Sequence, residues 1–318
     1  MINAPPSLIT VFGGSGFIGR YVCEMLLKAG ARLRIAERDP RRAFFLQPLG
    51  AMGQVTTFRA DFGRPKTIAR AVEGASAVIN LVGIFKGNLQ AVHVEGAGEA
   101  ARAARETGAA AFVHVSAIGA DVGSASDYGR TKGLGEAAVR GGFPGATIIR
   151  PSVVFGAEDE FTNRFASMAR LPILPVIAPK SRFQPVYVRD LARAIADAAL
   201  DPKQHGGKTY ELAGPEAMTM RELNVAIAAM AGHSPEIVDV PDFLAKAMAS
   251  LGFLPGAPLS RDQWLMLQRD NVAEPGAPGL DAFGITPTPL GAVAPNWLGR
   301  FVKGGRFAPT ALNHDATA

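Results

Sequence analysis

The sequence of 318 residues contains only one cysteine, Cys23, so no disulfide can form within the chain. Its five histidines are scattered without the spacing of metal ligands, and no metal site is expected. No run of about 18 consecutive apolar residues occurs, which argues against a membrane-spanning helix. The residues after Met1 lack the basic and apolar regions of a secretory signal, so the sequence predicts a cytoplasmic protein.

The residues that are present favour a folded protein with an anionic ligand. Hydrophobic residues make up 48% and charged residues 19% of the chain, as in globular proteins. Lys and Arg number 33 against 28 Asp and Glu, and the net charge of +5 suits nucleotides, acidic lipid headgroups or nucleic acid. Zinc fingers, arginine-rich tracts and basic stripes interleaved with aromatics are missing from the sequence, so we expect no nucleic acid partner.

Short apolar segments alternate with helix-like segments through the first half of the chain. Such alternation predicts a parallel sheet with helices on both faces, an α/β doubly wound sheet of the Rossmann type. The expected strands are 8–12, 31–36, 55–59, 77–82, 111–116 and 147–151, and the expected helices are 20–29, 65–73, 92–107 and about 128–140.

The sequence pattern changes after Pro151, because closely spaced prolines divide the chain into shorter segments. We expect residues 1–150 to form a dinucleotide-binding domain, which also receives part of 151–215. Residues 151–303 are expected to form a smaller C-terminal α/β cap that binds a substrate or partner through interleaved segments. Residues 304–318 are predicted to be a flexible tail.

A glycine-rich turn joins the first expected strand to the first expected helix. Gly13 allows the tight turn, Gly16 lets a pyrophosphate approach the backbone, and Gly19 lets helix and strand pack closely. The helix N-terminus then offers unpaired N–H groups to phosphate oxygens. The turn therefore predicts a dinucleotide site, with contacts from Gly13, Ser15, Gly16, Phe17, Ile18 and Gly19.

The end of the second expected strand bears on the choice between NAD and NADP. An acidic side chain there accepts hydrogen bonds from the ribose of NAD, whereas an arginine favours the 2′-phosphate of NADP. Glu37 fits the first role or is a solvated acid, and Arg38 fits the second. Arg41 and Arg42 are either further phosphate partners or ordinary surface charges. We expect NADP(H) in preference to NAD(H), with Arg38 as the main phosphate partner.

Two further segments lie where strands are expected to end. The carboxylate of Asp61, followed by Phe62, is placed to accept from an adenine amino group, or it serves as a cap or turn residue. Leu81, Val82 and Gly83 end the fourth strand, and Gly83 permits close approach of ribose and phosphates or simply begins a loop. We expect all five to contact the nucleotide.

Tyr128 and Lys132 are spaced by one helical turn and share a helix face. A nearby ammonium group stabilises a phenolate, so we expect Lys132 to lower the pKa of Tyr128 towards neutrality. The ammonium group of Lys132 is also suited to bind a hydroxyl of the nicotinamide ribose. Both residues are expected to contact the cofactor.

These features, with the segment 150–156, resemble the extended or atypical short-chain dehydrogenase/reductase superfamily. The resemblance implies Tyr128 as acid/base, Lys132 as its partner and Ser116 as the residue that polarises a substrate carbonyl. It also implies cofactor contacts from Pro151 and Val153. The superfamily commonly has a second, catalytic serine where this chain has Ala117, and whether Ser116 or Ser124 substitutes is open, so cofactor binding is more secure than catalysis.

A narrower resemblance covers about residues 8 to 300. The segments 10–13, 165–168, 184–190 and 284–290 are similar to the nucleotide-binding accessory subunit of respiratory complex I, the alpha-subcomplex subunit 9 family, in a bacterial form. The resemblance implies a tightly bound NADPH with a mainly structural role. It also implies complex I subunits or a membrane surface as partners, at the inner face of the cytoplasmic membrane.

Two hypotheses follow, an NADPH-binding accessory protein and an NADP-dependent oxidoreductase, epimerase or dehydratase that uses Tyr128. A redox-sensing regulator is a third. For the first hypothesis, the apolar segment Phe243–Leu254 and Trp264 form either a partner surface or a core helix of the cap. The oligomeric state is open.

For the second hypothesis, in which the protein is an enzyme, we expect substrate contacts at Phe155, Arg164, Phe183 and Tyr187. Each of these residues has a role in packing as its alternative.

Overall fold

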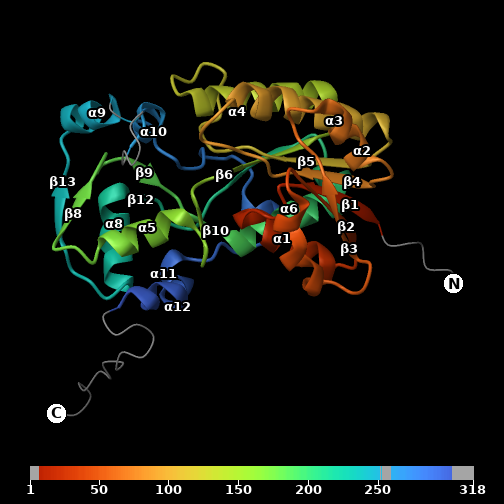
Figure 1. Ribbon diagram of the computed structural model, residues 1–318. Coiled ribbons are helices and arrows are strands. Elements are labelled where there is room, and N and C mark those ends of the chain that lie inside the picture. Colours follow the sequence, from red (N-terminus) through yellow and green to blue (C-terminus); the bar gives the residue numbers. More distant parts are fainter. Residues whose placement is uncertain (1–6, 251, 253–258, 303–318) are drawn as a thin grey trace, which may run out of the picture.

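The computed structural model describes residues 7–250, 252 and 259–302 (Figure 1). Its main part is a seven-stranded parallel sheet with the strand order β11-β6-β5-β4-β1-β2-β3, so the predicted doubly wound α/β fold is confirmed. The predicted tail, 304–318, lies outside the described residues. The strands are β1 (Leu8–Phe12), β2 (Arg32–Glu37), β3 (Val55–Arg59), β4 (Ala77–Asn80), β5 (Ala111–Val115), β6 (Thr147–Pro151) and β11 (Thr209–Leu212).

The central strands are apolar on both sides because helices cover both faces of the sheet. Every residue of β4 and β5 is buried. One face packs on α1 (Phe17–Lys28) and α6 (Val188–Leu200), and the other on α2 (Pro65–Val72), α3 (Ala97–Glu106) and α4 (Asp127–Gly142). Figure 1 shows the second group above the sheet and the first group below it. The order of the strands reverses between β1 and β4, where sheets of this type bind ligands.

Several element boundaries differ from the sequence prediction in ways that affect the site. Helix α1 begins at Phe17 and not at Arg20, because the glycine turn passes directly into the helix. Strand β4 ends at Asn80, two residues earlier than expected. The expected helix 92–107 begins instead with a π-helical stretch at Gln90–Gly96, which passes into α3. Between β2 and β3 lies an unpredicted 3₁₀ stretch, η1 (Pro40–Leu49).

The rest of the chain builds a smaller α/β unit beside the carboxyl ends of the main strands (Figure 1). Its core includes Phe155, Phe183, Leu223 and Leu298. None of the described helices is both long and apolar enough to cross a membrane. The strands pair as β7 (Val154–Phe155) with β10 (Val186–Tyr187), β8 (Ile173–Val176) with β13 (Glu236–Asp239), and β9 (Arg182–Phe183) with β12 (Met218–Thr219). Its helices include α5 (Glu160–Met168), α8 (Met220–Met230), α9 (Asp242–Ser250), α10 (Arg261–Leu267), α11 (Leu290–Val293) and α12 (Pro295–Leu298), with the 3₁₀ turn η4 (Gly299–Phe301). Helix α7 (Pro202–His205) and the 3₁₀ turn η3 (Leu280–Phe283) pack instead on the main sheet, where the ring of Phe283 stacks on His205 with centroids 4.4 Å apart.

Candidate dinucleotide site

The glycine turn packs tightly between β1 and α1. Gly13 has a φ of +79°, a conformation that favours glycine, and its carbonyl accepts from the N–H of Gly16 at 3.1 Å. A Cβ on Gly19 would lie 2.4 Å from the oxygen of Gly13, so only glycine fits. Among the described residues, no side chain caps the N-terminus of α1. The first backbone N–H groups of α1 are therefore free to bind phosphate oxygens, as a dinucleotide requires.

A carboxylate from the neighbouring strand orders this turn. Glu37, at the end of β2, accepts a hydrogen bond from the backbone N–H of Ser15 through Oε1 at 2.8 Å. The sequence left open whether Glu37 binds a ribose or is solvated. The structure shows a third role, in which the side chain is half-buried and fixes the middle of the turn.

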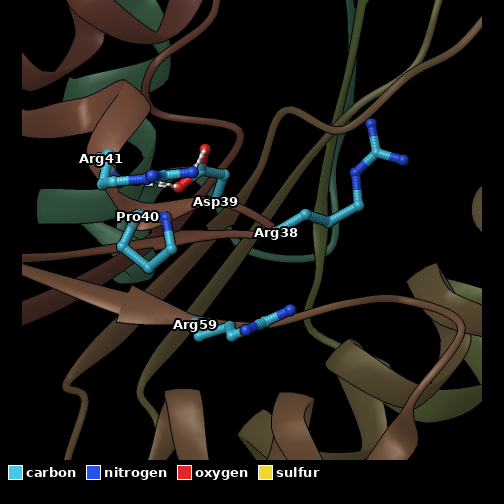
Figure 2. Close-up of a pocket in the computed structure, with 5 residues that line it drawn as sticks. All are labelled: Arg38, Asp39, Pro40, Arg41 and Arg59. Atoms are coloured by element: carbon cyan, nitrogen blue, oxygen red, sulfur yellow. Dashed lines mark hydrogen bonds and ion pairs between the residues drawn. The ribbon is translucent and has the colours of Figure 1, made fainter.

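Beyond Glu37, three arginines line a surface cavity of about 470 Å³, together with Asp39 and Pro40. Arg41 is held by Asp39 through two hydrogen bonds of 2.9 and 3.0 Å. Arg38 and Arg59 make no ion pair with any acid in the described part of the chain. Figure 2 shows both extending to the side of the cavity away from the Asp39 and Arg41 pair.

Arg59 was missed in the sequence. It ends β3 and pairs in register with Glu37 on β2, which brings it beside Arg38. The sequence did contain a signal that could have identified Arg59, because it is a basic residue at the end of the expected strand 55–59, which was predicted to lie next to the second strand. Arg42 does not line the cavity.

The segment after β3 and the end of β4 both lie near the carboxyl end of β1, from which the glycine turn starts. Asp61 accepts from the N–H of Gly63 at 3.0 Å and so has the turn role that the sequence left open. Phe62 packs edge-on against Phe12, with ring centroids 5.2 Å apart. The N–H of Val82 is bound by Asn80 Oδ1 at 3.0 Å.

The loop after β4 lies against the glycine turn and leaves open space at Gly83. The backbone carbon of Leu81 lies 3.3 Å from where a Cβ of Gly13 would be. A Cβ on Gly83 would meet no described atom within 4 Å, so this point is open. The residues present therefore fit a dinucleotide across the β1 and β4 strand ends.

Tyr128 and Lys132 lie on α4, one turn apart, but each has other partners. The Tyr128 ring stacks on Phe85, with centroids 4.7 Å apart, and meets the edge of His93 at 5.5 Å. Lys132 Nζ donates to the backbone oxygen of Val115 at 2.7 Å and is 2% exposed.

Burial shifts both pKa values away from what the sequence suggested. It raises the pKa of Tyr128 to about 12 and lowers that of Lys132 to about 8, although Glu136 opposes the second shift. The expected lowering of the tyrosine pKa was wrong, because the Lys132 ammonium binds a carbonyl and the phenol is packed against aromatic rings.

The cleft beside Tyr128 is small. Ala117, Ser124, Tyr128 and Lys132 line one side of it, and its volume is about 50 Å³. Ser116 is not among the lining residues; it is 4% exposed, and its hydroxyl has no hydrogen-bond partner in the described structure. Ala117 thus takes the place at the cleft that a polarising serine would need.

Two buried histidines behind the cleft were not predicted. His93 Nε2 accepts from the N–H of Ile84 at 3.0 Å, so its Nδ1 carries the proton and donates to Thr131 Oγ1 at 2.9 Å. His114 Nδ1 lies 3.1 Å from Asn80 Nδ2. Burial, with a contribution from Lys132, lowers the pKa of His93 to about 4 and that of His114 well below its ordinary value. Both are therefore neutral in the fold.

Comparison with known proteins agrees with this geometry. Residues 13–164 match a family model described as NAD(P)H-binding, and residues 120–249 match one for the RmlD substrate binding domain. The mouse (Mus musculus) protein NADH dehydrogenase (ubiquinone) 1 alpha subcomplex subunit 9, mitochondrial, is 34% identical over 88% of this chain and 77% of its own length. The chain belongs to the alpha subcomplex subunit 9 family. It is an NAD(P)H-binding member, as its strand ends and glycine turn indicate.

Relatives of this subunit 9 family member also include an enzyme. The ceramide reductase of Caulobacter vibrioides is 31% identical over 74% of this chain and 74% of its own length. Among solved structures, the quinone oxidoreductase QOR2 of Escherichia coli complexed with NADPH has a TM-score of 0.74, at 21% identity over 91% of this chain and 99% of that one. That likeness shows a shared fold.

In this subunit 9 family member, most of the expected substrate contacts lie in packing positions. Phe155 is fully buried and Phe183 is 7% exposed, both in the core of the smaller unit. Tyr187 packs on Phe155 with centroids 5.5 Å apart. Arg164 lies on α5. Val153, an expected cofactor contact, has its N–H bound by Asn271 Oδ1 at 2.9 Å, and Pro151 ends β6.

The expected partner surface is described only in part, since residues 251, 253 and 254 lie outside the described residues. Phe243 on α9 is 76% exposed. Trp264 Nε1 donates to Asp242 at 3.0 Å, and Lys246 lies over the indole ring at 5.7 Å. Helices α9 and α10 are thus joined to one another.

Proposed function

We propose that this protein holds NADPH as a structural ligand and docks as an accessory subunit on a membrane-associated respiratory complex. The observation that carries the proposal is the cavity with Arg38 and Arg59, combined with the small Tyr128 cleft. Bound NADPH supplies a hydride donor, which the structural role does not use.

The preference for NADPH rests on the charges at the ends of β2 and β3. Arg38 and Arg59 present two guanidinium groups to one cavity, and the carboxylate of Glu37 is engaged by Ser15. Paired arginines recognise a phosphate through charge-assisted hydrogen bonds. A 2′-phosphate bound in this cavity would be attracted by both arginines, whereas a 2′-hydroxyl carries no charge for them to bind.

The proposal that NADPH has a structural role rests on the small size of the cleft beside Tyr128. Its volume of about 50 Å³ compares with roughly 300–1,000 Å³ for pockets that bind small molecules. Ala117 offers no hydroxyl to a carbonyl, and burial raises the pKa of Tyr128 to about 12, which makes the phenol a poorer proton donor. A ligand that binds only the folded state stabilises it by RT ln(1 + [L]/Kd), which is a sufficient role for a tightly held nucleotide.

The partner and the location rest on family membership and charge. Several relatives, among them the mouse and Arabidopsis thaliana proteins, are named as subunits of mitochondrial NADH dehydrogenase. We propose that this chain joins the equivalent complex as a peripheral subunit at the inner face of the cytoplasmic membrane. Its net charge of +5 suits the anionic headgroups of that surface. We further propose that it contributes one copy to the complex.

The proposed preference for NADPH is tested by titrating the protein with NADPH and with NADH and monitoring binding by fluorescence. Arg38→Ala and Arg59→Ala should each weaken NADPH binding about tenfold or more and leave NADH binding within about twofold, because one charged hydrogen bond contributes about 1.5–3 kcal/mol. Arg42→Ala is the control, since Arg42 is an exposed arginine of the same segment that does not line the cavity. Equal losses for both nucleotides would contradict the assignment of a 2′-phosphate site.

The partner part is tested by affinity purification of the tagged protein from its own mildly solubilised membranes. Complex I subunits should co-purify in near-equal amounts, with NADPH released on denaturation of the eluate. Recovery of the protein alone, from the soluble fraction, would overturn the accessory-subunit proposal.

A reductase is the second candidate, because Tyr128 and Lys132 face one cleft and a ceramide reductase is among the relatives. An epimerase or dehydratase would use the same pair. Tyr128→Phe removes the phenolic proton and keeps the ring that stacks on Phe85. If the protein is an enzyme, this variant loses NADPH oxidation on a carbonyl panel and retains NADPH binding. The structural role predicts no turnover in either protein.

A further inference from the structure

Residues 260–271, named here the lid segment, cross the cleft beside Tyr128. They comprise Ser260, α10 and the four residues that follow it. Side chains of this segment complete the wall opposite Ala117 and Tyr128, and the remaining volume of about 50 Å³ holds only a few waters. The lining residues from the segment are Leu265, Met266, Arg269, Asp270 and Asn271.

The C-terminal end of the lid segment is fixed by several hydrogen bonds. Asn271 donates its N–H to the carbonyl oxygen of Arg182 at 2.8 Å, and Asp270 accepts from the N–H of Arg182 at 2.8 Å. The side chain of Asn271 accepts from the hydroxyl of Ser152 at 2.7 Å and from the N–H of Val153 at 2.9 Å. These bonds attach the C-terminal end of the lid segment to β9 and to the residues that follow β6.

The N-terminal end is held much less firmly. Helix α10 has no fully buried side chain. Its bond to the nucleotide-binding unit comes from Asp262, whose carboxylate oxygens accept from the N–H of Asp127 at 2.5 Å and of Tyr128 at 3.1 Å. That position is the positive end of the α4 dipole, where a carboxylate is stabilised. Further polar contacts across the cleft are an exposed ion pair of 3.5 Å between Arg269 and Asp121 and a hydrogen bond of 3.4 Å from Asn271 Nδ2 to the carbonyl oxygen of Ile118.

We propose that the lid segment is a hinged cover over the Tyr128 cleft, with Asp262 as its latch and Asp270 and Asn271 as its hinge. The closed form excludes substrates and slows loss of the nucleotide that Tyr128 and Lys132 are expected to contact. Because α9 is joined to α10 through Asp242 and Trp264, both helices move together. The inference rests on the proposed function, for which it supplies the reason that NADPH is retained without turnover.

The cover itself is tested without nucleotide, by hydrogen exchange followed by mass spectrometry. Asp262→Ala should speed amide exchange in residues 261–267 and at the start of α4 at least tenfold, with exchange at Arg182 unchanged. Asp281→Ala is the control, since that exposed acid accepts only a local N–H, from Gly279. If Asp262→Ala folds poorly by circular dichroism, Asp262→Asn keeps the shape and removes the charge. Unchanged exchange in a folded variant would overturn the proposal.

The effect on the ligand is tested with the NADPH-loaded protein. Asp262→Ala should release NADPH at least fivefold faster in a chase with excess NADP⁺ and make its fluorescence more accessible to acrylamide. Faster exchange with an unchanged release rate would overturn the retention role. If the unaltered protein binds no NADPH, the proposed function fails, but the exchange experiment still decides whether the cover exists.

Discussion

The carboxylate of Glu37 accepts a hydrogen bond from the backbone N–H of Ser15 at 2.8 Å, so the end of β2 fixes the middle of the glycine turn. An acid at this strand end is thereby used for the shape of the phosphate-binding turn. The neighbouring cavity is left to Arg38 and Arg59, whose charge suits a phosphate. One side chain thus bears on two properties, the order of the turn and the choice of nucleotide.

The first prediction concerns this bond. Glu37→Ala should weaken NADH binding by about five- to thirtyfold, because the turn loses a charged hydrogen bond of about 1–2 kcal/mol before the nucleotide binds. The loss for NADPH should be smaller, because removing the negative charge beside the 2′-phosphate offsets part of it. Glu37→Gln keeps an oxygen acceptor for Ser15 and removes a negative charge, so it should leave NADH affinity within about threefold and raise that of NADPH. Titration by calorimetry measures both. A loss confined to NADH on Glu37→Ala would instead assign Glu37 to the ribose.

The second prediction concerns the turn and α1. An alanine Cβ at Gly19 would lie 2.4 Å from the oxygen of Gly13 and 2.6 Å from that of Gly14. Gly19→Ala should therefore destabilise the fold by about 1–3 kcal/mol and lower NADPH affinity at least tenfold, since the phosphate-binding turn must move.

A matched glycine on another helix separates crowding from helix propensity. Gly141 lies in α4, is exposed, and offers a Cβ open space out to 4 Å among the described atoms. Gly141→Ala should leave NADPH affinity unchanged and stabilise the protein by up to about 1 kcal/mol. Urea unfolding and NADPH titration measure the two effects, and equal behaviour of both variants would rule out the packing role of Gly19.

The main sheet could be predicted from the sequence because its strands are continuous apolar runs separated by helices. The same holds for the glycine turn, whose spacing is local. Arg59 was missed because its role depends on the register of β3 against β2, which pairs it with Glu37. Sequence spacing carries no direct information on such a pairing.

Other features were missed for a related reason. His93 and His114 look scattered in the sequence, and only the packing of β5 and of the π-helical stretch Gln90–Gly96 beside α4 places them behind the cleft. Asp262 reaches the start of α4 from far along the chain. The pKa of Tyr128 was misjudged because spacing on a helix shows that Lys132 is near, but not that its ammonium binds Val115.

The third prediction concerns pH. Burial lowers the pKa of His93 from 6.5 to about 4, so the unfolded chain binds a proton that the folded chain does not over that interval. The contribution of neutral His93 is fully present above pH 6.5 and is lost as pH falls towards 4, by about 3 kcal/mol over the interval. Burial acts on His114 in the same direction. Urea midpoints at pH 7, 5.5 and 4.5 measure the decline.

His93→Gln retains an acceptor for Ile84 and a donor for Thr131 but does not titrate in this range. Its stability should fall less steeply with acid than that of the unaltered protein, although it starts lower at pH 7. Parallel pH curves for the two proteins would show that His93 is not the group responsible.

The fourth prediction concerns the ion network that holds α4, and with it Tyr128 and Lys132, on the sheet. Arg150 on β6 binds Glu136 of α4 through two hydrogen bonds of 2.8 Å and Glu211 of β11 through one of 3.3 Å. Both carboxylate side chains are less than a tenth exposed. Arg150→Met would leave two buried negative charges without their partner, and we expect a loss of about 3–5 kcal/mol in unfolding free energy.

Arg140 supplies a matched control, because it also joins α4 to β11, through a hydrogen bond of 2.7 Å to Thr209, but is exposed. Arg140→Met should cost less than about 1 kcal/mol. Adding Glu136→Gln and Glu211→Gln to Arg150→Met should recover much of the lost stability, because no buried charge then lacks compensation. Urea unfolding at pH 7 measures all three proteins. If the triple variant were no more stable than Arg150→Met, the cost would lie in lost packing and not in the uncompensated carboxylates.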